Sequence, residues 1–216
     1  MMMRSLSDTV VCFDLDDTLY KEIDYLKSAY REISDFVGQT EALDQMLDWY
    51  QAGENTFKKL IDTYGLTVGI ADLLKIYREH YPDIHLDKGV KEYLAGLKED
   101  GAKLGLITDG RGSTQRNKTK ALGLDGLFDI EIISEEFGSG KPCLKNYQVV
   151  MGKFPERQMF VYVGDNPAKD FVAPNQLGWK TFCLKDDGRN IHRQDFLLSK
   201  EYLPNHIVDS LEEIIK

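Results

Sequence analysis

The sequence is poor in cysteine and histidine, and it contains no long hydrophobic run. The three cysteines among the 216 residues, Cys12, Cys143 and Cys183, are odd in number and widely spaced. They indicate neither a disulfide framework nor a zinc site, and we interpret them as core thiols. The four histidines show no ligand spacing, which argues against a histidine metal site. Near the N-terminus Asp8 and Asp14 interrupt the apolar residues, so we expect neither a signal peptide nor a membrane span.

The sequence also contains fewer basic than acidic residues. The 27 lysines and arginines face 36 acidic residues, and the formal net charge is -9. Because such a protein is repelled by a phosphate backbone, we do not expect nucleic acid as a partner. The hydrophobic content of 42% is that of a globular protein, and the length suffices for one domain of ordinary size plus an insertion. Together these features predict a cytoplasmic protein that does not bind membranes.

Three carboxylates follow the first apolar stretch of the chain. Residues Thr9–Phe13 are β-branched and apolar, which predicts a buried strand, and Asp14, Asp16 and Asp17 come directly after it. Carboxylates this close repel one another and lose hydration near a core, so they need a cation or a positive side chain. Asp14 and Asp16 would share one side of an extended chain and could converge on one centre. The alternative is a strand end followed by a polar turn, with Thr18 as a helix cap.

Between residues 20 and 86 the sequence changes to a helical pattern. Apolar residues recur three and four positions apart, which predicts three helices, the last of them ending near Pro82. The three stretches lie at residues 23–33, 43–50 and 70–77. We expect a small helical domain inserted after the first strand. Its aromatic side chains could line a substrate pocket, but at helical spacing most of them should be packing residues.

From residue 87 onward, strands and helices alternate, which predicts a parallel sheet covered on both faces. The expected strands after the first are at residues 103–107, 128–133, 159–163 and 180–184. In such sheets ligands bind at the carboxyl ends of the strands. Asp14, Thr108 and Asp165 all follow strands, and Lys141 lies in the loop after another. We therefore expect these four side chains to meet.

These polar groups share a chemistry. An aspartate can attack phosphorus to give an aspartyl-phosphate, provided that the charges of the carboxylate and the phosphate are neutralised. Mg²⁺ suits that task, with Asp14 and Asp165 as its carboxylate ligands. Groups that could hold the phosphate are a hydroxyl, two backbone N–H groups and an ammonium, supplied by Thr108, Asp109, Gly110 and Lys141.

Four motifs carry a resemblance. DLDDT at 14–18, ITDG at 107–110, GKP at 140–142 and GDNPAKD at 164–170 resemble, in order and separation, those of the haloacid dehalogenase (HAD) superfamily. The helical block resembles the cap that one branch of this superfamily inserts after its first motif. The resemblance implies an α/β fold with a Rossmann-like parallel sheet of strand order 5-4-1-2-3. It also implies a core of residues 1–19 and 87–216 and a cap of residues 20–86.

The resemblance also implies a role for each motif residue. Asp14 would be the nucleophile, and Asp16 the general acid and base, with its backbone carbonyl rather than its carboxylate on the metal. Asp165 would ligate Mg²⁺. Asp170 would support the metal site without touching the ion, or pair with Lys141.

The function that these residues favour is a Mg²⁺-dependent phosphatase acting on small phosphorylated metabolites. A phosphatase needs a second carboxylate to protonate the leaving alcohol and to activate water, and Asp16 supplies it. A dehalogenase needs neither that acid nor Mg²⁺, so Asp16 and Asp165 argue against it. A sugar phosphomutase of the same superfamily would keep Asp16 and remains the alternative. A non-catalytic binding module would be expected to lose a motif, and none is lost.

Two polar segments receive no role in this interpretation. We expect the basic run at residues 116–120 to be a solvated helix face. We expect residues 186–190 to form a polar loop after the last clear strand. The C-terminal tail from residue 206 should be a short strand and a packing helix.

Overall fold

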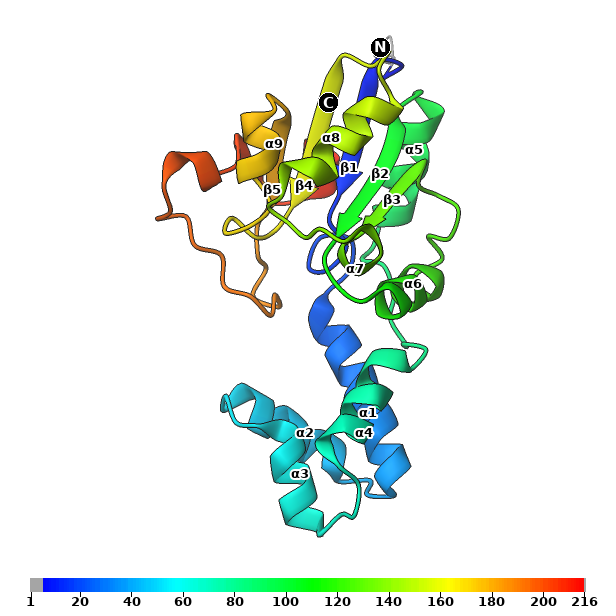
Figure 1. Ribbon diagram of the computed structural model, residues 1–216, viewed down its shortest axis with the longest axis vertical. Coiled ribbons are helices and arrows are strands. Elements are labelled where there is room, and N and C mark those ends of the chain that lie inside the picture. The colour runs from blue at the N-terminus through cyan, green and yellow to red at the C-terminus, as the bar shows by residue number, and fades with distance from the viewer. Residues whose placement is uncertain (1–5, 216) are drawn as a thin grey trace.

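The computed structural model describes residues 6–215 as a sheet covered by helices, with a helical bundle beyond one end of the sheet (Figure 1). All six strands run parallel in the order β3-β2-β1-β4-β5-β6. They are β1 (Thr9–Phe13), β2 (Lys103–Thr108), β3 (Ile130–Ile133), β4 (Met159–Gly164), β5 (Lys180–Leu184) and β6 (His206–Val208). This is the predicted 5-4-1-2-3 order, viewed from the other edge, with β6 added. The predicted fold class is confirmed.

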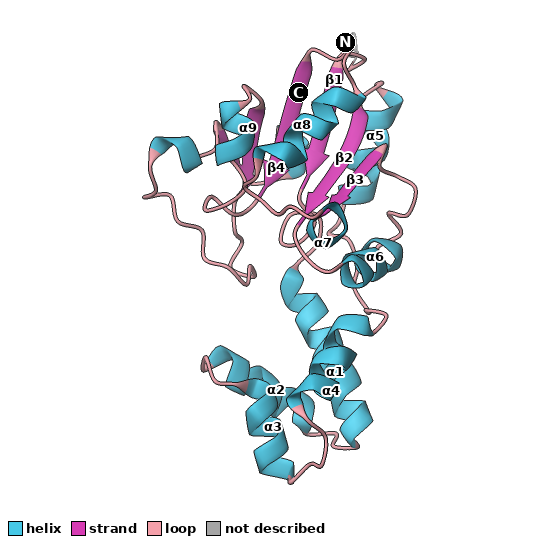
Figure 2. Cartoon of the chain, in the orientation of Figure 1, coloured by secondary structure: helices cyan, strands magenta, loops and turns pink. Residues whose placement is uncertain are grey.

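Helices cover both faces of the sheet. They are α5 (Val90–Glu99), α6 (Gly112–Ala121), α7 (Ser134–Phe137), α8 (Leu144–Lys153) and α9 (Val172–Gln176). Alternate side chains of β1 point to opposite faces. Val11 and Phe13 pack with Leu94 of α5, whereas Val10 and Cys12 pack with Tyr147 of α8. Fully burying a side chain of this size contributes about 1.5–3 kcal/mol. The sheet is thus anchored on both sides, and its carboxyl ends point toward the bundle (Figure 2).

The bundle consists of α1 (Glu22–Val37), α2 (Ala42–Gln51), α3 (Thr56–Tyr64) and α4 (Ile70–Glu79) around an apolar cluster of its own. The prediction of three helices is wrong, because α3 was missed. Its signal is short but present: Phe57, Leu60, Ile61 and Tyr64 stand at helical spacing. The side chain of Asn55 accepts a hydrogen bond from the Lys58 N–H at 3.1 Å, which caps the helix.

Two linkers, residues 14–21 and 80–89, join the bundle to the sheet. Beyond them, the bundle meets α6, where the Thr114 hydroxyl donates to the Arg78 carbonyl at 2.8 Å. The Asn117 amide donates to the carbonyls of Glu79 and His80, each at 3.2 Å. Apolar contacts add to these hydrogen bonds, because Tyr25 of α1 belongs to the same apolar cluster as Val11 and Phe13 of β1.

Smaller differences from the sequence analysis concern β3, the tail and one cysteine. Strand β3 begins at Ile130 rather than at residue 128, and the tail after β6 contains a short 3₁₀ helix, Leu211–Glu213, like that at Lys200–Tyr202. Cys12 and Cys183 are buried, whereas Cys143 is exposed, so its prediction as a core thiol is wrong. Within residues 6–215 the structure has no helix that is long and apolar enough to cross a membrane.

Candidate active site

Four segments bring polar side chains together at the carboxyl end of the sheet. Asp14 follows β1, Thr108 ends β2, Asp165 follows β4, and Lys141 lies in the loop before α8. Above Asp14 is a cavity of about 80 Å³. It is lined by Asp14, Asp16, Asp17, Glu22, Asp109, Asp165, Asn166, Lys169 and His192. The cavity is strongly acidic.

Lys141 is the cation at the centre of the site. Its Nζ lies 2.8 Å from Oδ1 of Asp14 and 2.7 Å from Oδ1 of Asp170, and the Lys141 and Asp170 side chains are fully buried. Burial alone would lower the pKa of Lys141, but the two carboxylates raise it well above its usual value. Lys141 therefore remains charged. It is shared by two carboxylates, so the cluster keeps an excess of negative charge.

Asp170 is held rigidly between Lys141 and the loop after β4. Its Oδ2 accepts the N–H groups of Asp165 at 3.2 Å and Asn166 at 2.8 Å, while Oδ1 meets Lys141. A Cβ atom on Gly164 would lie 2.5 Å from the Asp170 Oδ2, so this approach requires glycine. Both oxygens of Asp170 thus accept hydrogen bonds from protein donors. The bond from the Asp165 N–H to Asp170 fixes the backbone position of Asp165.

The arrangement fits a divalent cation. Ligand oxygens of Asp14, Asp165 and Asp170 lie within 4.8 Å of one another. Burial, together with repulsion by Asp170 and Asp14, raises the pKa of Asp165 to about 9. Burial also raises the pKa of Asp14 to about 6, although Lys141 opposes the shift. Because the Asp170 oxygens are occupied, Asp14 and Asp165 are the carboxylates that could hold Mg²⁺, a hard cation that prefers oxygen ligands.

Asp16 has a separate set of partners on the bundle side of the site. Its Oδ1 accepts from the Lys118 Nζ at 2.7 Å and from the Tyr20 hydroxyl, and its Oδ2 accepts from the Gln115 amide at 3.0 Å. Burial alone would raise the pKa of Asp16, but Lys118 and these hydrogen bonds bring it below its usual value. Asp16 is therefore a stable carboxylate in this structure.

The prediction that residues 116–120 form a solvated face is wrong at Lys118. Its side chain is only 4% exposed, and its Nζ lies 4.3 Å from the ring centroid of Tyr25. The sequence did contain a signal that Lys118 shares a helix face with Gln115, because the two residues are three positions apart on α6.

The groups predicted to hold a phosphate are only partly assembled. The Thr108 hydroxyl accepts from the Gln115 amide at 2.7 Å, and the Asp109 carboxylate accepts the backbone N–H of Lys141 at 2.9 Å. The Gly110 N–H donates to the Ser134 hydroxyl at 2.9 Å. Lys141 thus contacts Asp14, and Asp109 lines the cavity above Asp14, whereas the Thr108 hydroxyl meets Gln115 and the Gly110 N–H is already occupied.

The loop after β5 contributes groups that the sequence analysis missed. The Asn190 Nδ2 donates to Oδ2 of Asp165 at 3.0 Å, and His192 lines the cavity above Asp14. The backbone N–H of Ile191 donates to Oδ2 of Asp17 at 3.0 Å. Residues 186–190 are the polar loop that was predicted, but the contact of Asn190 with Asp165 was missed. No local pattern marks it, because Asn190 and Asp165 are 25 positions apart in the sequence.

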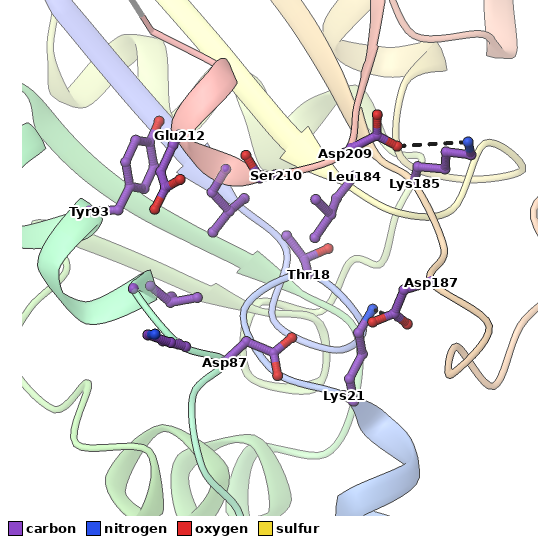
Figure 3. A pocket seen from close by; sticks show the side chains of 14 residues that line it. Thr18, Lys21, Asp87, Tyr93, Leu184, Lys185, Asp187, Asp209, Ser210 and Glu212 are labelled. Atoms are coloured by element: carbon purple, nitrogen blue, oxygen red, sulfur yellow. Dashed lines mark ion pairs between the residues drawn. The ribbon is translucent and has the colours of Figure 1, made fainter.

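Thr18 does not cap α1, contrary to the alternative considered from the sequence. The Glu22 N–H at the start of α1 donates instead to Oδ1 of Asp17 at 2.9 Å. The Thr18 hydroxyl has no hydrogen-bond partner among the described residues and lines a second cavity of about 210 Å³ behind the linkers (Figure 3). Charged side chains in its wall pair with one another, as Lys185 does with Asp209 at 3.7 Å. None of Asp14, Asp165 and Asp170 lines this larger cavity.

The site therefore consists of a parallel sheet that carries, at its carboxyl end, two aspartates bridged by one lysine. The model of the family of haloacid dehalogenase-like hydrolases matches residues 11–184, and the chain belongs to this family. It is therefore an HAD-like hydrolase.

Relatives and solved structures extend this comparison. The chain is 29% identical to the glyceraldehyde 3-phosphate phosphatase of Methanocaldococcus jannaschii, covering 95% of this chain and 94% of the relative. It is 24% identical to the ribulose-1,5-bisphosphate 5-phosphatase of Halopiger xanaduensis, covering 95% and 97%. A magnesium-bound structure of the HAD-hydrolase YfnB from Bacillus subtilis has the same fold, with a TM-score of 0.70, 20% identity and coverage of 95% and 96%.

Proposed function

We propose that the protein is a Mg²⁺-dependent phosphatase of small phosphate monoesters, with Asp14 as its nucleophile. The observation that carries the proposal is the buried cluster of Asp14, Asp165 and Asp170, which has a single shared lysine. Three carboxylates with one ammonium leave negative charge that a divalent cation would neutralise. Asp14 and Asp165 would hold the metal, with the backbone carbonyl of Asp16. When bound, the metal would neutralise the charge of the phosphate oxygens.

The reaction proceeds in two displacements. First, an Asp14 oxygen bonds to phosphorus, the bond from phosphorus to the ester oxygen breaks, and the departing oxygen takes a proton from the Asp16 carboxyl. Second, a water oxygen bonds to phosphorus while Asp16 takes a proton from that water. The bond between phosphorus and Asp14 then breaks and releases inorganic phosphate. Thr108 and Lys141 hold the phosphate oxygens during both steps.

The surroundings of Asp16 support its role as the base of the second step. Lys118 and Gln115 stabilise the ionised carboxylate that must accept the proton of water. The first step needs the protonated form, so the contact with Lys118 has to weaken when substrate binds. Lys118 also lies against Tyr25 of α1, so a shift of the bundle on substrate binding would change this contact.

The substrate is a small metabolite phosphate, and residues 20–86 act as the cap that selects it. The cavity above Asp14 has a volume of only about 80 Å³, which favours small phosphate esters over phosphoproteins and polymers. Glu22, at the start of α1, lines this cavity, and burial, together with the nearby Asp16, raises its pKa to about 8. An uncharged carboxyl there favours a polar, neutral leaving group such as the hydroxyl of a sugar or triose. Phosphatases of such metabolites are among the relatives.

The test is a phosphate-release screen over metabolite monoesters with Mg²⁺ and with EDTA. We expect turnover only with the metal, and we expect Asp14→Asn to abolish it while the fold persists, because an amide cannot form the phosphoester. Asp125→Asn, at an exposed loop position, is the matched control and should retain full activity. Full turnover in EDTA, or isomerisation of a sugar phosphate without free phosphate, would contradict the proposal. The latter result would identify a phosphomutase.

A further inference from the structure

Residues 186–194, which we call the β5 loop, are fixed beside Asp165 by their own hydrogen bonds. The Asn190 N–H donates to Oδ1 of Asp186 at 3.0 Å, and the Asp186 N–H donates to Oε1 of Gln194 at 3.0 Å. The Gln194 amide in turn donates to the carbonyls of Asp165 at 2.7 Å and Leu184 at 2.8 Å. The β5 loop is therefore built onto the backbone of a candidate metal ligand.

The Asn190 side chain joins two charged residues. Its Nδ2 lies 3.0 Å from Oδ2 of Asp165, and its Oδ1 lies 2.8 Å from the Nζ of Lys21. An ammonium can only donate hydrogen bonds, so the amide oxygen must face Lys21. The NH₂ group must then face Asp165. Lys21 thus determines which end of the amide meets the carboxylate.

Lys21 is a buried cation outside the cavity above Asp14. Its side chain is 4% exposed, and its second partner is Asp187, at 3.4 Å, as Figure 3 shows. A buried ammonium carries a desolvation cost that its partners must offset. It stands directly before α1, in the first linker of the bundle. Its position connects the linker to the β5 loop.

We propose that Asn190 and Lys21 are positioning residues for the metal ligand Asp165, Asn190 by direct contact and Lys21 by orienting the Asn190 amide. The inference rests on the proposed function, because it takes Asp165 to be a ligand of Mg²⁺. The neutral amide holds one oxygen of Asp165 and leaves the other for the ion. A lysine in direct contact with Asp165 would compete with the metal for the carboxylate, whereas a lysine one residue removed does not.

Neighbouring contacts place this pair at the junction of the sheet and the bundle. The Ile191 N–H donates to Asp17 in the first linker, and the Ile191 side chain packs against the bundle cluster. Arg189 pairs with Asp87 of the second linker at 3.2 Å. The β5 loop therefore touches both linkers as well as Asp165.

The experiment is a direct titration of the purified protein with Mg²⁺ by calorimetry, without substrate. We expect Asn190→Leu and Lys21→Met each to weaken Mg²⁺ binding about tenfold, in the range found when a contact that orients a ligand is removed. The double variant should be no weaker than the weaker single variant, because both changes remove the same orientation. Lys185→Met is the matched control, because Lys185 is an exposed lysine that lines the larger cavity together with Lys21, and this variant should bind Mg²⁺ as the wild type does.

A folded Asn190→Leu protein with wild-type Mg²⁺ affinity would overturn the inference, and so would additive losses in the double variant. If Lys21→Met does not fold, Asn190→Leu still decides, because it leaves the Lys21–Asp187 pair in place. Turnover should return when the Mg²⁺ concentration is raised, which a merely structural defect would not allow. Failure of the proposed function has a different signature: the wild type itself would bind no Mg²⁺, or would turn over phosphate esters without it.

Discussion

The two sides of the site differ in how their carboxylates are compensated. On the sheet side, Lys141 is shared by Asp14 and Asp170, and Asp165 has no cation within ion-pair distance among residues 6–215. On the bundle side, Asp16 alone receives Lys118, with Gln115 and Tyr20 as additional donors. The first side carries excess charge that a metal can use. The second holds one carboxylate in its ionised form, ready to accept a proton.

The largest expected effect comes from breaking the sheet side at its lysine. We expect Lys141→Met to abolish phosphatase turnover and to lower the free energy of unfolding by about 3–5 kcal/mol, because two buried carboxylates lose their cation. Urea unfolding and a phosphate-release assay measure the two effects. Lys120→Met, at an exposed position of α6, is the control and should change neither. A Lys141→Met protein with wild-type stability would show that the ion pairs of Lys141 with Asp14 and Asp170 do not contribute to the stability of the fold.

The excess charge also predicts a pH dependence of metal binding. In the metal-free protein the pKa values of Asp14 and Asp165 are raised, to about 6 and about 9, so the folded state holds protons that the unfolded state releases. The contribution of these two carboxyls to the stability of the metal-free fold is therefore fully present below their unfolded pKa of about 4, and it is lost as pH rises through their folded pKa values toward about 9. Mg²⁺ has to displace these protons, so its affinity should rise about tenfold per pH unit between about pH 6 and about pH 9.

Calorimetric titrations with Mg²⁺ at several pH values measure this slope. Melting temperatures with Mg²⁺ and with EDTA should diverge as the pH rises, because ligand binding stabilises the folded state. An affinity that does not change with pH would mean that the carboxylates are already ionised in the metal-free protein.

Breaking the bundle side should slow proton transfer and leave the metal in place. We expect Lys118→Met to reduce turnover about 100-fold, near the lower limit of what a positioned acid or base contributes. Losing the ammonium raises the pKa of Asp16, so the acid limb of the rate profile should move to higher pH. The pH profile of kcat, which includes the second displacement in which Asp16 acts as the base, measures this shift, with Lys120→Met again as the control. An unchanged profile would separate Lys118 from the function of Asp16.

The sequence predicts the sheet side better than the bundle side for a physical reason. Apolar runs in the sequence predict the strands. Because ligands bind at the carboxyl ends of parallel strands, Asp14, Lys141 and Asp165 can be placed together without any knowledge of side-chain packing. The contact between Lys118 and Asp16 spans 102 positions, and that between Ile191 and Asp17 spans 174. Such contacts depend on how the bundle and the β5 loop dock onto the sheet, and no local periodicity encodes that docking.

The smallest effect concerns the close approach that fixes the sheet side. A Cβ atom on Gly164 would lie 2.5 Å from Oδ2 of Asp170, which cannot move away because Lys141 and two backbone N–H groups hold it. We expect Gly164→Ala to lower the free energy of unfolding by about 1–3 kcal/mol, the usual cost of overpacking. Gly152→Ala is the matched control, because its helical position in α8 has open space around it and should gain about 0.5–1 kcal/mol. Urea unfolding of both variants measures the difference. A Gly164→Ala protein as stable as the wild type would show that Asp170 moves away from the methyl group. The sheet side would then be less rigid than its hydrogen bonds indicate.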